Sequence, residues 1–191
     1  MQSRTLRNFN LVIILFCLSS LICKGQQSKK DALVNILQLS NKVEDINTII
    51  PVLKKYPDLY NSIPLGKPIK VDYVISSPFG NRYHPIDKVY KFHSGIDLVS
   101  DYATTIHATA DGTVIFAGRK GGYGKCVIIE HQFGYSTIYA HLTLYYTKKG
   151  SKVTKASVIG FLGNTGKSTA DHLHYEIKKN NKSINPYLWM D

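Results

Sequence analysis

The chain has 191 residues, of which 43% are hydrophobic and 19% are charged, and its formal net charge is +11. This length and hydrophobic content suffice for one domain with its own core, which excludes a chain that is disordered throughout. This positive charge favours binding to anionic surfaces in general. The Lys and Arg residues are spread along the sequence, with no long basic run interleaved with aromatic residues, so nucleic acid is not an expected partner.

Residues 1–25 have the pattern of an export signal. Arg4 and Arg7 precede an apolar run over residues 11–22, which is too short for a comfortable membrane-spanning helix. Small residues at alternate positions follow this run, and we expect cleavage after Gly25. The mature protein would then be exported to the periplasm or to the exterior of the cell, with no stable membrane span.

Two alternatives to cleavage are an uncleaved anchor and a lipid attached to Cys23. Ile22 disfavours the lipid, because it is bulky where lipoprotein processing sites usually carry Gly or Ala. Cleavage after residue 25 removes three basic residues and no acidic residue, which lowers the formal charge from +11 to +8. It also removes two of the three cysteines, so Cys126 has no partner for an internal disulfide.

Residues 26–66 are predicted to form a helical extension or linker. Apolar residues recur there at spacings of three and four, beginning with Ala32, Leu33 and Ile36. Pro51 is expected to end or kink a helix. The segment carries no group with obvious chemistry, so we expect it to pack on the main domain or to link that domain to the point of export; a propeptide that covers the active site is the alternative.

From Lys67 the pattern changes to short strands separated by glycine-containing turns. The predicted strands are rich in β-branched and aromatic residues and cover residues 113–117, 126–130, 136–142 and 172–177. This spacing predicts a mainly β fold, a compact antiparallel sandwich or barrel, over residues 67–191.

A histidine and an aspartate lie four residues apart, at His93 and Asp97. In a fully extended chain these residues would lie about 13 Å apart, too far to share a metal ion whose ligand bonds are about 2 Å long. Gly95 allows a bend between them, and a bent pair can offer a nitrogen and a carboxylate oxygen to one ion. By itself this pattern is common by chance.

His172 and His174 flank Leu173 in a predicted strand. Residues two apart in a strand point to the same face, so both imidazoles would lie side by side while Leu173 enters the core. One histidine could then bind a metal while the other handles protons. Two surface histidines on an edge strand explain the motif in isolation equally well.

His141 ends another predicted strand. Strict alternation places it on one face with Tyr135, Thr137 and Tyr139, opposite an apolar face. We interpret the face with His141 as the polar side of the strand. For this run alone, an ordinary half-buried strand is the simpler explanation.

Six motifs between about Ser76 and Ile177 match one known family in order and in flanking residues. They are Ser77-Pro-Phe-Gly-Asn-Arg-Tyr-His-Pro85, Phe92-His-Ser-Gly-Ile-Asp-Leu98, Ala110-Asp-Gly-Thr-Val114, Gly122-Tyr-Gly124, Tyr139-Ala-His-Leu142 and Gly163-Asn-Thr-Gly-Lys-Ser-Thr-Ala-Asp-His-Leu-His-Tyr-Glu176. With these motifs the chain resembles the lysostaphin-type (LytM-type) zinc metalloendopeptidases. The resemblance implies that residues 67–191 form a zinc metallopeptidase domain, with a groove over an antiparallel sheet.

The resemblance also implies the roles of five residues. Zn²⁺ would be bound by His93, Asp97 and His174, and the catalytic pair would be His141 and His172. Three protein ligands leave one coordination position open for a water, which becomes a nucleophile near neutral pH. We therefore predict an endopeptidase that hydrolyses peptide cross-links of bacterial peptidoglycan through a metal-activated water. The spacing does not say which of the two catalytic histidines is the base and which stabilises the oxyanion.

Other polar residues in the motifs could also contribute to the site. Asp171 stands where the family often has Pro, and its carboxylate could orient a nearby imidazole or raise its pKa. Tyr83 or Tyr139 could donate a hydroxyl to the reaction, and Asn81 and Arg82 could line the groove. Packing or purely structural roles account for the two tyrosines and the arginine equally well.

Two other functional classes share features with this sequence. A non-catalytic wall-binding or amidase-activating module would keep the fold, but such relatives usually lack one or more of the five site positions, all of which are present here. A lipoyl-like or biotinyl-like carrier also has short strands and glycine-rich turns, but no lysine lies in the corresponding hairpin. The cross-link could join D-amino acids directly or contain glycine; export without an evident wall-anchoring repeat favours direct cross-links. No pattern indicates an oligomeric state.

Overall fold

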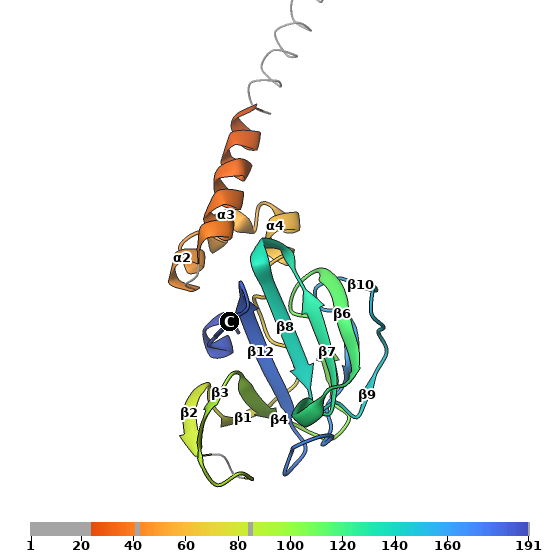
Figure 1. Cartoon of the computed structure of the whole chain (residues 1–191). Helices are drawn as coiled ribbons and strands as arrows, with labels where there is room; N and C mark the ends of the chain where they lie inside the picture. The colour runs from red at the N-terminus through yellow and green to blue at the C-terminus, as the bar shows by residue number, and fades with distance from the viewer. Residues whose placement is uncertain (1–23, 41–42, 84–85, 191) are drawn as a thin grey trace, which may run out of the picture.

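The computed structural model describes residues 24–40, 43–83 and 86–190 (Figure 1). The predicted export signal falls mostly on residues outside this part of the chain, as do His84 and Pro85 of the first motif. Within the described residues, no helix has both the length and the hydrophobicity needed to cross a membrane.

An eight-stranded antiparallel sheet forms the centre of the fold (Figure 1). Its strands lie in the order β1 (Val74–Ser77), β4 (Ile96–Val99), β12 (Leu173–Lys179), β8 (Tyr135–Ala140), β7 (Lys125–Glu130), β6 (Gly112–Arg119) and β10 (Lys152–Val153), and β13 (Lys182–Ile184) pairs with β12. The predicted mainly β, antiparallel fold is confirmed.

Among the described residues of the β region, two smaller sheets and three 3₁₀ helices accompany the central sheet. A three-stranded sheet contains β5 (Thr105–His107), β11 (Val158–Phe161) and β9 (Leu144–Tyr145), and a hairpin contains β2 (Gly80–Tyr83) and β3 (Tyr90–His93). The 3₁₀ helices are η1 (Gly121–Tyr123), η2 (Gln132–Gly134) and η3 (Pro186–Trp189).

The central sheet is apolar on both faces, in unequal amounts. One face packs against the three-stranded sheet, so that Leu98, Tyr139 and Tyr175 share one buried cluster with Ile106 and Ile159. This arrangement is the predicted sandwich, with side chains at alternate strand positions directed into the core. The opposite face carries a smaller buried cluster, made of Cys126, Ile128, Ile138 and Ala140.

The N-terminal segment is helical and packs on the central sheet at one end (Figure 1). Its elements are a helix over 24–39, α2 (Val43–Asn47), α3 (Ile50–Leu53) and α4 (Pro57–Asn61). Leu33 and Leu37 join the large core, and the buried Lys179 at the end of β12 donates a hydrogen bond of 2.9 Å to the carbonyl of Leu37. Pro51 was predicted to end or kink a helix, but it lies in the first turn of α3. Backbone N–H groups of a first turn have no acceptor within the helix, so the N–H that proline lacks removes no hydrogen bond there.

Candidate metal centre

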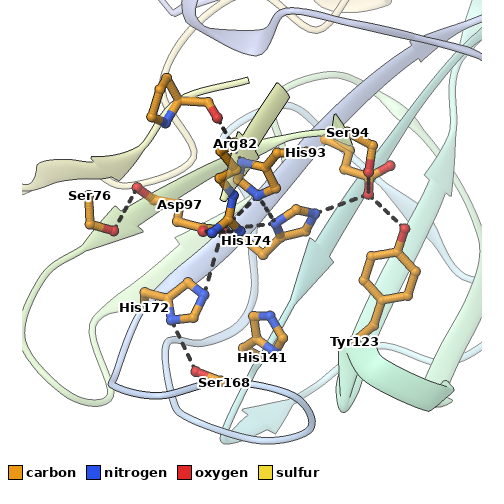
Figure 2. A network of polar contacts seen from close by, with 12 residues as sticks. Ser76, Arg82, His93, Ser94, Asp97, Tyr123, His141, Ser168, His172 and His174 are labelled. Carbon is orange, nitrogen blue, oxygen red and sulfur yellow. Dashed lines mark hydrogen bonds and ion pairs between the residues drawn. The ribbon is translucent and has the colours of Figure 1, made fainter. Parts of the chain in front are cut away.

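Strand pairing brings His93, Asp97 and His174 together. His93 ends β3, and Asp97 in β4 pairs directly with His174 in β12, so that their side chains share a face of the central sheet. One ligand atom from each of the three residues lies within 4.8 Å of the others, and all three residues are buried. Figure 2 shows the three side chains pointing toward one another.

Gly95 allows the chain to bend between His93 and Asp97. A Cβ atom at this position would lie 2.4 Å from the carbonyl oxygen of Tyr175 and 3.0 Å from Cε1 of His174. Glycine is therefore required by the close approach to β12. The bend that the sequence predicted brings Nε2 of His93 to 3.2 Å from Oδ1 of Asp97.

The two candidate ligand histidines, His93 and His174, each direct one ring nitrogen to an oxygen outside the candidate ligand set. Nδ1 of His93 lies 2.8 Å from the carbonyl oxygen of Pro78, and Nε2 of His174 lies 3.0 Å from Oε1 of Glu176. Burial raises the pKa of Glu176, but hydrogen bonds from His174 and neighbouring hydroxyls outweigh it and lower this pKa to about 2. Because a carbonyl and an ionised carboxylate only accept hydrogen bonds, these nitrogens carry the ring protons, and the other two present lone pairs to the site.

The ligand atoms fit a tetrahedral zinc ion. His174 Nδ1 lies 3.0 Å from His93 Nε2 and 2.9 Å from Asp97 Oδ1. Ligands bound at about 2.0–2.1 Å to tetrahedral zinc lie about 3.3 Å from one another, close to these separations. Three lone pairs at such distances repel one another unless a positive charge lies between them. Two imidazole nitrogens and a carboxylate oxygen are typical zinc ligands.

Electrostatics around Asp97 favour its ionised form. Burial raises the pKa of Asp97, but protonation of His174 or His93 on the nitrogen that faces Oδ1 outweighs burial and holds this pKa well below its usual range, and a metal ion would supply the positive charge in place of that proton. Nη2 of Arg82 lies 3.3 Å from Oδ2, the oxygen that does not face the two histidines. The arginine therefore leaves Oδ1 available to a metal ion.

His141 and His172 lie beside the ligand set. Their ring centroids are 4.7 Å apart, and Nε2 of His172 lies 3.6 Å from Oδ1 of Asp97. Nδ1 of His141 donates to the carbonyl of Thr165 at 2.7 Å, and Nδ1 of His172 donates to that of Ala170 at 2.8 Å. Each ring thus keeps a lone pair on Nε2. Burial lowers the pKa of His141 to about 4, so this ring is neutral near pH 7.

The structure corrects how His141 reaches the site. Strand alternation predicted a polar face shared with Thr137 and Tyr139, but both of these residues are fully buried in the core. β8 ends at Ala140, and His141 has a positive φ of 62°, which turns its side chain to the opposite face of the sheet. The interpretation of that strand face as polar was therefore wrong, although His141 does line the pocket.

The open pocket over the ligands includes some of the other predicted residues and not others. Arg82 lines it, whereas Asn81, Tyr83, Tyr139 and Asp171 do not. Tyr83 stacks edge-on with Tyr90 outside the pocket, and the hydroxyl of Tyr139 bonds Thr109 in the core. No described residue of the helical segment lines the pocket.

Three residues near the ligands were not assigned a role from the sequence. They are Glu176, whose Oε1 lies 3.0 Å from the outer nitrogen of His174, and Ser94 and Tyr123, whose hydroxyls donate to that same oxygen. Each lies inside one of the quoted motifs, so position within a motif was the available signal. Spacing alone could not show that the three side chains meet.

Comparison with known proteins identifies the same region. The sequence profile of Peptidase family M23 matches residues 91–186. The chain is 49% identical over 112 residues to the DD-carboxypeptidase/endopeptidase Mpg of Neisseria meningitidis, covering 59% of this chain and 26% of that protein. It is 36% identical over 119 residues to the peptidoglycan DD-endopeptidase ShyA of Vibrio cholerae, covering 62% of this chain and 28% of that protein.

A solved structure shares the fold. The crystal structure of a zinc-containing peptidase from Vibrio cholerae superposes with a TM-score of 0.59 and 31% sequence identity, covering 63% of this chain and 38% of that chain. The chain thus spans about a quarter of the length of the two curated relatives and less than half of this structure.

Proposed function

Because the chain belongs to peptidase family M23, we propose that it is a zinc-dependent endopeptidase that hydrolyses peptide cross-links of bacterial peptidoglycan. The observation that carries this proposal is the convergence of three ligand atoms within 4.8 Å, beside two further histidines in an open pocket. The name of the ShyA relative, a peptidoglycan DD-endopeptidase, supports the substrate class, and the name of the Mpg relative, a DD-carboxypeptidase/endopeptidase, supports the reaction class.

The residues His93, Asp97 and His174 would hold the zinc ion. When bound, zinc supplies a Lewis acid that polarises a peptide carbonyl and makes water a nucleophile near neutral pH. Pro78 and Glu176 keep the ring protons of the two histidines on the outer nitrogens, and Arg82 holds the second oxygen of Asp97. The ligand set is thereby oriented before any metal arrives.

His141 and His172 would handle the proton and the developing negative charge. Each keeps its Nδ1 proton on a backbone carbonyl, so its Nε2 is the atom that accepts or returns a proton at the pocket. A ring that has taken up the proton becomes a cation and can stabilise an oxyanion on the substrate. Such contributions are worth about 10² to 10⁴ in rate.

We extend the proposal to location and organisation. Residues 1–25 would direct export, residues 26–66 would pack on the sheet, and residues 67–191 would form the metallopeptidase domain. Action on peptidoglycan requires a location outside the cytoplasm, in the periplasm or outside the cell. The relatives named for peptidoglycan cleavage support such a location.

Single substitutions in residues 26–191 test the assignment. His174→Ala should abolish both zinc retention and the release of soluble fragments from purified sacculi. His141→Ala should retain about one zinc per chain but lose fragment release, because its ring is not a ligand. The control His107→Ala removes an imidazole that, among the described residues, bonds the Thr105 hydroxyl and the carbonyl of Ala156, and it should behave as the wild type.

Each outcome has a clear meaning. Fragment release that survives His174→Ala would refute the ligand assignment, and zinc loss in His141→Ala would refute the division into ligands and catalysts. A wild-type protein that binds zinc but releases no fragments would identify the non-catalytic, wall-binding alternative. Mass spectrometry of the released fragments, from walls of known chemistry, identifies the bond that is cut.

A further inference from the structure

Three residues from three different motifs meet at one buried carboxylate. Oε1 of Glu176 accepts hydrogen bonds from Ser94 Oγ at 2.6 Å, from the Tyr123 hydroxyl at 2.7 Å and from His174 Nε2 at 3.0 Å; Figure 2 labels the three donor residues. Glu176 is completely buried, and its other oxygen lies 3.3 Å from Nζ of Lys178. Burying a carboxylate is unfavourable, and three donors to Oε1 together with the ion pair at Oε2, which has no hydrogen-bond partner among the described residues, offset that cost.

The backbone fixes the relation between Glu176 and the ligand. His174 and Glu176 lie two residues apart in β12, so both side chains point to the site face while Tyr175 enters the core. The His174 ring is held between Asp97 Oδ1 on its Nδ1 side, at 2.9 Å, and Glu176 on its Nε2 side. A rotation of this ring would break one of these two contacts.

We propose that Glu176 is a positioning residue of the metal centre, which holds the His174 ring with its proton on Nε2 and its Nδ1 lone pair on the metal, and that Ser94 and Tyr123 hold Glu176 in place. This inference rests on the proposed zinc ligation by His174. A carboxylate that accepts from a ligand imidazole also increases the basicity of the ligating nitrogen.

The same carboxylate connects the other functional segments. Ser94 follows the ligand His93 directly, so its bond to Glu176 ties the bend between β3 and β4 to β12. Tyr123 ends η1, and its backbone carbonyl accepts a hydrogen bond of 2.9 Å from the backbone N–H of His141. Glu176 thus links two ligand segments with the turn that presents His141.

Zinc affinity is the measurement that separates positioning from general stability. The zinc dissociation constant is measured by competition with a chromophoric chelator, on protein whose folded fraction is known from circular dichroism. Glu176→Ala should weaken zinc binding by about 10- to 100-fold. Glu176→Gln keeps an acceptor oxygen without the charge, so it should restore most of that loss and remain about 3-fold to 10-fold weaker than the wild type.

Two milder variants and one control complete the test. Tyr123→Phe and Ser94→Ala each remove one bond to Glu176, and each should weaken zinc binding by about 3-fold to 10-fold. The control Thr109→Val removes a hydroxyl that bonds Tyr139 and Tyr175 in the core. It should lower the melting temperature and leave zinc affinity unchanged.

Unchanged zinc affinity in folded Glu176→Ala would overturn the inference. If Glu176→Ala does not fold, unchanged affinity in both Tyr123→Phe and Ser94→Ala overturns it instead. Equal weakening in Thr109→Val and the Glu176 variants would also overturn it, because general destabilisation would then explain the loss. A wild type that binds no zinc would refute the proposed function itself, which keeps the two failures distinct.

Discussion

Substitution of Gly95 by alanine should damage the metal centre without removing any functional group. The added Cβ would lie 2.4 Å from the carbonyl oxygen of Tyr175, where ordinary contacts begin at 3.4 Å. The two atoms must therefore separate by about 1 Å. Tyr175 pairs with Ile96 on one side and with Tyr139 on the other, so the carbonyl cannot move without disturbing two strand pairs.

The size of the effect follows from this geometry. Overpacking costs about 1–3 kcal/mol, and the clash with backbone places Gly95→Ala near the upper end. For a chain of this size, about 3 kcal/mol lowers the melting temperature by roughly 6–12 °C. Ligand distances tolerate only about 0.2 Å of error, so a shift of the bend relative to His174 should also weaken zinc binding by at least about tenfold.

Differential scanning calorimetry and chelator competition measure the two effects. Gly122→Ala is a matched control, because its Cβ would meet only Cβ of Lys167, at 3.7 Å, and it should change the melting temperature by less than about 2 °C. Zinc affinity of Gly122→Ala should equal that of the wild type. A Gly95→Ala protein with wild-type melting temperature and zinc affinity would refute the argument that close packing at residue 95 sets the ligand geometry.

Three further perturbations test other contacts. Burial lowers the pKa of His131 from its ordinary value of 6.5 to about 4. The unfolded chain therefore takes up a proton below about pH 6.5, whereas the folded chain does so only near pH 4. As the pH falls through this window, the free energy of unfolding should decrease by up to about 3 kcal/mol. Urea titrations at pH 7 and pH 4.5 should show a smaller loss in His131→Gln, and an equal loss would contradict the assignment. Lys179→Met removes the hydrogen bond to the Leu37 carbonyl. This substitution should lower the free energy of unfolding by about 1–3 kcal/mol and accelerate proteolysis within residues 24–39. An unchanged rate of cleavage would contradict a role of Lys179 in anchoring that helix. Zinc at about 100 times its dissociation constant should stabilise the wild type by about 2.7 kcal/mol over chelator-treated protein but should not stabilise Asp97→Ala, and equal stabilisation of both proteins would exclude Asp97 as a ligand.

The strands were the most predictable part of the fold. Predicted strands at residues 113–117 and 126–130 fall within β6 and β7, because alternating apolar and turn residues are a local signal. The order of strands in the sheet is not local. β4 lies between β1 and β12 in the sheet, although β12 is far from both strands in the sequence. No spacing in the sequence indicates that β4 and β12 are neighbouring strands.

Sequence motifs predicted the candidate site, and the fold supplies its geometry. The resemblance selected His93, Asp97 and His174, and cross-strand pairing explains why Asp97 and His174 meet. The bend at Gly95 was predicted, but its physical reason was not visible in the sequence, since the need for glycine comes from the approach of β12. The role inferred for Glu176 likewise depends on donors from two distant segments.

His141 shows where a local rule fails for a physical reason. Alternation assumes extended backbone, whereas a non-glycine residue with a φ of 62° is unfavourable by about 1–2 kcal/mol and persists only when its surroundings hold it. Two hydrogen bonds hold His141 in this conformation. Its backbone N–H donates to the Tyr123 carbonyl at 2.9 Å, and its ring Nδ1 donates to the Thr165 carbonyl at 2.7 Å. Tyr123 therefore supports His141 through its backbone and Glu176 through its hydroxyl. Because Tyr123→Phe keeps the backbone contact, it should weaken zinc binding while leaving His141 in place, which separates the two roles of this residue.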